Sequence, residues 1–144
     1  MSEGPVAEQD YVDQFREVRV PFDGLIGLVL DSVTLEAVSG SLVLDPERHM
    51  QPYGIVHGGV YAAIGESLAS MGAALWAARD GRQAVGLENH TSFIRATRGG
   101  TLHATARPLQ HGRTVHLWEV LIEDDDDRLV AKTTVRLALP EARH

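Results

Sequence analysis

One carboxylate, Glu66, lies in the middle of a long apolar stretch. Helix formers and small residues run from Gly58 to Ala78, and apolar side chains cover every face of the helix that they predict. Such a helix is expected to be buried, and an unpaired carboxylate on it costs several kcal/mol of lost solvation. Buried carboxylates are frequent in active sites as nucleophiles or general bases. The alternative is a structural acid that a serine or a backbone group satisfies.

Two glycines, Gly58 and Gly59, open this predicted helix directly after His57. Free N–H groups at a helix N-terminus, together with the helix dipole, stabilise negative charge that develops on a carbonyl oxygen. Without side chains at these positions, an acyl group can approach the backbone closely. Both glycines also fit a structural role in turn geometry and close packing. The stretch therefore offers a carboxylate and an oxyanion-binding helix start.

The spacing of these groups bears on how they could form one site. His57 and Glu66 are nine residues apart, which is roughly 13 Å of rise and about half a turn of net rotation. They therefore point to opposite sides of one straight helix. If they act together, a second copy of the helix must bring them together, as a two-fold dimer would. Ser70 lies one turn past Glu66 on the same face, within reach of a hydrogen bond or a bridging water.

Composition limits the class of protein. A chain of 144 residues with 44% hydrophobic and 23% charged residues is expected to form one globular domain. The formal charge of −7 argues against nucleic acid as a partner, and the absence of cysteine excludes disulfides and thiolate chemistry. No uncharged apolar run reaches 18 residues, and the acidic N-terminus lacks a signal pattern. We expect a cytoplasmic protein that does not contact a membrane.

The order of the predicted elements is helix, two strands, long helix and four strands. One long apolar helix and several strands at hairpin spacing predict an α+β domain with an antiparallel sheet wrapped around the helix. The acidic run from Asp124 to Asp127 is interpreted as a solvated hairpin tip, because it lacks the spacing of a calcium loop. The histidines show no metal-binding spacing, so no metal is expected. The predicted ranges are a helix at 8–18, a break at 21–24, strands at 25–37 and 39–44 with a turn at 38–40, the long helix to 78, and strands at 83–94, 101–109, 114–122 and 129–139.

The pattern Gln51-Pro-x-Gly-x-x-His57-Gly-Gly, with Glu66 nine residues after the histidine, resembles the hotdog-fold acyl-CoA thioesterases. Within them it is most similar to the PaaI-like branch, which contains the Arthrobacter-type 4-hydroxybenzoyl-CoA thioesterase and the enterobactin-pathway proofreading enzymes. The match extends from about Pro21 to Leu139. The resemblance implies one hotdog domain at 21–140, preceded by an N-terminal segment at 1–20 that contains a short helix.

The resemblance also implies roles for the residues of the motif. Glu66 would attack the thioester carbonyl or activate water for that attack, and the sequence leaves both routes open. The Gly58 amide would polarise the thioester oxygen, with Gln51 adding or supporting a donor. His57 would place the loop or help to polarise the thioester, and Ser70 would hold water or the carboxylate.

Contacts with coenzyme A are implied by two further segments. Phe93–Arg95 and His111–Thr114 match family segments that meet the pantetheine arm and the nucleotide phosphates, and a guanidinium fork suits phosphate. The chain departs from the family where His90 replaces a frequent asparagine and Ala96 a frequent proline. The expected substrate-binding residues are Gly59, Arg95, Gly112, Arg113 and Thr114.

The function expected from these features is hydrolysis of an acyl-CoA, with an aromatic or medium-sized acyl group, to the free acid and coenzyme A. No cofactor is expected, because coenzyme A is part of the substrate. The minimal active unit would be a homodimer, and the family implies a homotetramer. The enzymatic alternative is a hotdog enoyl-CoA hydratase or dehydratase, which typically uses an Asp/His pair. The alternative from another class is a non-catalytic acyl-CoA-binding module.

Overall fold

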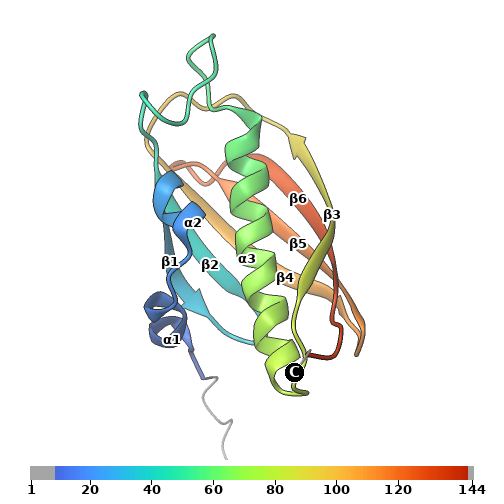
Figure 1. Cartoon of the computed structure of the whole chain (residues 1–144). Helices are drawn as coiled ribbons and strands as arrows, with labels where there is room; N and C mark the ends of the chain where they lie inside the picture. Colours follow the sequence, from blue (N-terminus) through green and yellow to red (C-terminus); the bar gives the residue numbers. More distant parts are fainter. Residues whose placement is uncertain (1–8, 143–144) are drawn as a thin grey trace, which may run out of the picture.

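The computed structural model describes residues 9–142 as one long helix packed on a single antiparallel sheet (Figure 1). The sheet has six strands in the order β1-β2-β4-β5-β6-β3. The predicted α+β class and the central helix are confirmed. The elements are α1 (Val12–Glu17), α2 (Pro21–Ile26), β1 (Leu28–Val33), β2 (Val38–Val43), α3 (Gly58–Ala78), β3 (Val85–Phe93), β4 (Thr101–His111), β5 (Val115–Glu123) and β6 (Leu129–Ala138).

Glycines let α3 lie close to the sheet. A Cβ atom at Gly65 would come within 2.6 Å of the side chain of Thr133 on β6, and one at Gly72 would overlap the Trp118 ring on β5. The expectation that α3 is buried on all sides is wrong for the protomer. Small side chains on the face away from the sheet, including Ser70, remain partly exposed, because only one face of the helix meets the strands.

The N-terminal region differs from its prediction in two places. The helix expected at 8–18 is shorter, Val12–Glu17, and residue 8 lies outside the described residues. The break expected at 21–24 is wrong, because Pro21 begins the short helix α2. Proline suits the first position of a helix, where its missing N–H would have no partner. Gly27 ends α2 with a φ of 81°, which a glycine adopts without strain.

The turn between β1 and β2 also lies earlier than predicted. The turn expected at 38–40 is wrong, because β2 already begins at Val38. The Thr34 N–H donates to the Ala37 carbonyl at 2.9 Å, and the Ala37 N–H donates back to the Thr34 hydroxyl at 3.1 Å. Gly40 lies within β2, where a Cβ atom would come within 2.9 Å of the Val29 carbonyl oxygen. A glycine required by close packing was thus interpreted as a turn former.

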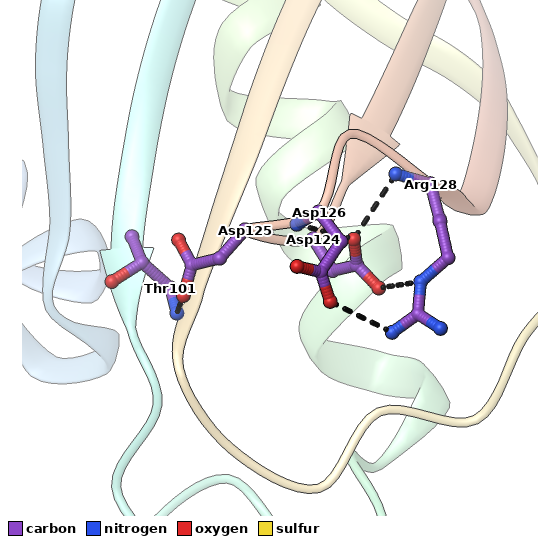
Figure 2. A network of polar contacts seen from close by, with 5 residues as sticks. All are labelled: Thr101, Asp124, Asp125, Asp126 and Arg128. Atoms are coloured by element: carbon purple, nitrogen blue, oxygen red, sulfur yellow. Dashed lines mark hydrogen bonds and ion pairs between the residues drawn. The ribbon is translucent and has the colours of Figure 1, made fainter.

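The acidic run forms the tip of the β5–β6 hairpin, as predicted, but only Asp125–Asp127 are solvated, because Asp124 is buried (Figure 2). Asp124 accepts hydrogen bonds from the backbone N–H groups of Asp126 and Arg128 and from Nε of Arg128. Asp125 accepts from the Thr101 N–H at 3.0 Å and from Nε2 of His103 at 2.8 Å. The bond from His103, followed by that from Thr101, lowers the pKa of the Asp125 carboxyl. These bonds tie the hairpin tip to the start of β4.

Strand β3 forms one edge of the sheet and pairs only with β6. Almost all of its residues are exposed, including the large apolar side chains Leu87 and Phe93. At the opposite edge, α1 contacts β1, because the Tyr11 N–H and the Arg16 guanidinium donate to β1 carbonyls. Within residues 9–142, the outer edge of β3 has no such cover. No helix in this range is long and apolar enough to cross a membrane.

Replacing Gly72 by alanine tests the close contact between α3 and the sheet. The added methyl group would overlap the fully buried Trp118 ring, so we expect Gly72→Ala to lower the free energy of unfolding by about 1–3 kcal/mol. Urea unfolding followed by tryptophan fluorescence measures this difference. Gly24→Ala is the matched control, because no atom lies within 4 Å of its added Cβ. Equal stability of both variants would contradict the packing argument.

Candidate active site

The N-terminus of α3 is capped by a histidine. Nδ1 of His57 accepts a hydrogen bond from the Gly59 N–H at 2.9 Å, and the His57 carbonyl accepts from the Val60 N–H. Because Nδ1 accepts, the neutral ring carries its proton on Nε2. Among the described residues, the Gly58 N–H has no hydrogen-bond partner. The helix start thus keeps one free donor, backed by the dipole of a 21-residue helix.

Gln51 lies beside this free donor. The Tyr53 N–H donates to Oε1 of Gln51, which leaves the side-chain NH2 group as the remaining donor. Gln51, Gly58, Tyr61 and Phe93 line a cavity of about 240 Å³ at the start of the helix. A Cβ atom at Gly58 would overlap the Phe93 ring, so only glycine leaves room for this ring beside the helix start. The two residues that carry these donors, Gly58 and Gln51, therefore line the same cavity.

Glu66 is partly buried and is held by the edge strand β3. Nδ2 of Asn89 donates to Oε2 of Glu66 at 3.1 Å and to the Ala62 carbonyl at 3.1 Å. The Thr91 hydroxyl donates to Oδ1 of Asn89 at 2.7 Å, which fixes the orientation of the amide. A Cβ atom at Gly86 would overlap Oε1 of Glu66, so this glycine makes room for the carboxylate. The acid is thus oriented by a donor and placed against the β3 backbone.

The free amide and the carboxylate lie at different points along the same pair of elements. Gly58 and Glu66 are eight residues apart on α3, a rise of about 12 Å. Gly58 lies next to Phe93 at one end of β3, and Glu66 lies next to Gly86 near the other end. Phe93 is seven positions after Gly86 along the strand, a rise of about 23 Å. Within one protomer, the two groups therefore lie too far apart to bind the same carbonyl.

The remaining predicted residues are divided between the two ends of α3. Arg95 lines the cavity at Gly58, and Ser70 lies one turn past Glu66 without a hydrogen bond to it. Gly112 and Arg113 line a different cavity, of about 460 Å³, beside Trp76 at the far end of α3. Trp76 is eighteen residues, or about 27 Å, from Gly58. The structure therefore brings Gln51, Gly58 and Arg95 together but not the hairpin residues, Thr114 included.

The hairpin end of α3 carries an aromatic cluster. The Trp76 and His111 rings stack with their centroids 4.0 Å apart, and the Arg79 guanidinium lies 5.2 Å from the Trp76 centroid. Burial, followed by the charge of His111, lowers the pKa of His116, so this ring is neutral at pH 7. Nδ1 of His116 accepts from the Trp118 indole N–H at 3.1 Å, as a neutral ring can. Within the described protomer, this cluster belongs to the packing of β4 and β5 on α3.

Comparison with known proteins identifies the family. A sequence profile described as the thioesterase superfamily matches residues 53–131, more than half of the chain. The chain belongs to the thioesterase superfamily. The thioesterase is 43% identical over 128 residues to a protein of Mycobacterium tuberculosis named as a candidate esterase, covering 88% of this chain and 91% of that protein. It is 32% identical over 114 residues to the proofreading thioesterase EntH of Cronobacter sakazakii, covering 79% of this chain and 82% of that protein.

Solved structures agree with this assignment. The structure of the Mycobacterium tuberculosis protein superposes with a TM-score of 0.83, covering 87% of this chain and 100% of the other. A variant of the thioesterase PA1618 from Pseudomonas aeruginosa is 28% identical and superposes with a TM-score of 0.82, covering 89% of this chain and 92% of the other. The hotdog fold expected from the resemblance is confirmed, and the protein is a thioester hydrolase.

Sequence reasoning missed the residues of β3 that support the acid. The motif of the sequence does not include Asn89, although His90, where the chain departs from the family, is the next residue on this strand. The spacing of Asn89, Thr91 and Phe93 could have indicated this role. These residues are two positions apart and therefore share one face of a strand. That this face points at α3, however, follows only from the pairing of β3 with β6.

The histidine cap of the thioesterase gives a prediction about stability. His57→Ala removes the acceptor for the Gly59 N–H, and we expect a loss of about 1 kcal/mol in the free energy of unfolding. His57→Asn supplies another capping side chain and should restore most of this loss. Urea unfolding of the three proteins measures the effect. Unchanged stability in His57→Ala would show that the cap contributes nothing.

Proposed function

We propose that the protein hydrolyses acyl-CoA thioesters in sites shared by two subunits. Each site would combine the free Gly58 N–H of one protomer with Glu66 of its partner. The observation that carries this proposal is the position of Glu66. This acid is oriented by Asn89 on the edge strand β3, whose outer side is unpaired within residues 9–142, and it is distant from the helix start of its own protomer.

A two-fold pairing of β3 would join these two groups. The exposed edge of β3 offers unpaired backbone groups and apolar side chains, which favour pairing with another strand. Antiparallel pairing of two β3 strands about their middle places Phe93 of one protomer near Gly86 of the other. Because Phe93 lies on Gly58 and Gly86 lies on Glu66, the helix start of one subunit would meet the acid of the other. The homodimer is then the smallest active unit, and its assembly into a homotetramer remains a proposal from the family resemblance.

The proposed chemistry uses these groups in the following way. The thioester oxygen accepts a hydrogen bond from the Gly58 N–H, assisted by the Gln51 amide, and the helix dipole stabilises the charge that develops on it. Glu66 either removes a proton from an attacking water or attacks the carbonyl itself, giving an anhydride that water then opens. In both routes the C–S bond breaks, the water oxygen enters the acid product, and the thiolate leaves as coenzyme A.

Binding of the coenzyme A part is proposed for residues on both sides of this site. Arg95 lies at the rim of the cavity at Gly58 and is exposed, so its guanidinium can pair with phosphate. Gly59 and Ser70 would contact the pantetheine arm and an ordered water, respectively. The hairpin residues Gly112, Arg113 and Thr114 are distant from the Gly58 of their own subunit, so any contact with the substrate would come from the partner's copy.

Replacing Glu66 by glutamine tests the catalytic acid. Glutamine keeps the size and can still accept from Asn89, but it cannot act as a base or a carboxylate nucleophile, so kcat should fall at least about 100-fold. A thiol reagent follows coenzyme A release without reacting with the enzyme, because the chain has no cysteine. Glu88→Gln is the matched control, since Glu88 lies on β3, the strand that contacts Glu66, and pairs with Arg136 at 3.2 Å. Retention of a tenth or more of the rate by Glu66→Gln would refute the proposal.

The same assay separates the alternatives when it is run with a panel of aryl and straight-chain acyl-CoAs. Binding without release of coenzyme A across the panel would indicate a binding module. Addition of water to an enoyl-CoA, with the thioester intact, would indicate a hydratase. Neither outcome is expected, because the oriented acid and the free helix amide fit attack on a thioester carbonyl.

A mixed dimer tests the shared site directly. One subunit of a heterodimer carries Gly58→Ala, whose added methyl group would overlap the Phe93 ring at the helix start, and the other subunit carries Glu66→Gln. A different tag on each subunit allows the heterodimer to be purified. One of its two sites then has both native groups, and the rate should rise to about half of that of the native protein. Thermal melting confirms that both variants fold. A heterodimer no faster than its parents, or an active monomer in sedimentation, would place each site within one subunit.

A further inference from the structure

The hydrogen bonds that reach Glu66 begin on β6. Thr91 on β3 and Thr133 on β6 are opposite each other in the paired strands, and their hydroxyl oxygens lie 2.9 Å apart. Thr91 in turn bonds to Asn89 at 2.7 Å, and Asn89 bonds to Glu66 at 3.1 Å. These four side chains therefore form one hydrogen-bond network, which runs from β6 through β3 to the acid on α3.

A backbone carbonyl fixes the direction of the bonds in this network. The Ala62 carbonyl accepts from Nδ2 of Asn89 at 3.1 Å, and a carbonyl cannot donate, so the NH2 side of the amide must face α3. Oδ1 of Asn89 therefore faces Thr91, whose hydroxyl has to donate to it. A hydroxyl carries a single hydrogen, so the bond between the two threonines is donated by Thr133. Each donor in the network thus points along it toward Glu66.

Thr133 is the rigid end of the network. It is fully buried, and it faces α3, because a Cβ atom at Gly65 would come within 2.6 Å of its side chain. Gly65 directly precedes Glu66 on the helix. A β-branched side chain has a restricted χ1 angle, so packing against the helix sets the position of its hydroxyl. Thr133 therefore contacts the helix beside the acid and also supplies the first donor.

The other end of the network is open to water in the protomer. Asn89 is exposed and Glu66 is only partly buried, so water competes for their hydrogen bond. The proposed second subunit would exclude this water along β3, and a bond in a water-free site is stronger. Oε1 of Glu66 accepts no hydrogen bond from residues 9–142, which leaves this oxygen for the reaction.

We infer that Thr133 and Thr91 are positioning residues for thioester hydrolysis, which act on Glu66 through Asn89. This inference rests on the proposed role of Glu66 as base or nucleophile. Thr133 donates to Thr91, Thr91 holds the amide in one orientation, and the amide holds Oε2 of the acid. Without the hydroxyls, Oδ1 of Asn89 has no donor and the amide is free to rotate, so the carboxylate is no longer held in one position.

Valine substitutions remove the two hydroxyls and keep the branched shape of the side chains. For Thr91→Val we expect kcat to fall about tenfold and KM to stay within about twofold, because the amide loses the donor that orients it. For Thr133→Val we expect a smaller fall in kcat, about threefold, because only the outermost donor is lost. Serine at either position keeps a hydroxyl and should restore kcat to within about twofold of the native value. Release of coenzyme A measures all of these rates.

Thr134→Val is the matched control. Thr134 directly follows Thr133 on β6, but it pairs with His90 and lies on the opposite face of the sheet. Its hydroxyl makes no hydrogen bond within the described residues. The valine variant should therefore keep the native kcat. Urea unfolding of every variant shows whether a fall in kcat merely follows a loss of folded protein.

A double-mutant cycle separates positioning from packing. Asn89→Ala interrupts the network next to the acid and should lower kcat by about 10- to 30-fold, which leaves a measurable rate. In the Asn89→Ala background, Thr91→Val and Thr133→Val should cause no further fall, because both act only through the amide. Threonines that only support the fold would cause the same fold-loss in both backgrounds.

The outcomes distinguish failure of this inference from failure of the proposed function. Native kcat in either valine variant or in Asn89→Ala, equal losses in both backgrounds, or no recovery with serine overturns the inference and leaves the Glu66 site standing. Retention of a tenth or more of the rate by Glu66→Gln overturns both. A fall in kcat that serine reverses, and that vanishes in the Asn89→Ala background, supports the inference.

Discussion

The hydrogen bond from Asn89 to Glu66 is the contact on which the organisation of the site depends. It ties the acid of the central helix to the one strand whose outer edge is open within the described protomer. The amide can only donate through its nitrogen, so it orients one carboxylate oxygen and leaves the other beside Gly86. The proposed catalytic acid is therefore held at the strand along which the proposed second subunit would pair.

The glycines of the chain act together with this contact. Gly65 and Gly72 bring α3 close to the sheet, which brings Glu66 within reach of β3. Gly58 then leaves the helix start open, with the Phe93 ring beside it and its N–H free. Side chains at these positions would separate the helix from the strands, and the amide, the acid and the strand edge would no longer be in register.

How far the sequence could predict these features depended on the range of the interactions involved. The long helix, the four strands after it and the hairpin at 124–127 follow from local periodicity and turn residues, and each was predicted within a few residues. The errors arose where a glycine or proline had a role other than forming a turn. Gly40 is required by the approach of Val29 and Leu68, and Pro21 starts a helix, yet each is a turn signal when it is considered locally.

The sequence by itself determined the fold class, the family, and an acid nine residues after the histidine that precedes the glycine pair, because these depend on residue types at short, fixed spacings. Only the tertiary structure decided which groups contact one another. It placed Asn89 on Glu66, left Oδ2 of Asp23 without a donor from the described residues, and separated the 111–114 hairpin from Gly58. The physical reason is that these contacts join residues distant in the chain, and only the packing of α3 on the paired strands sets which side chains meet.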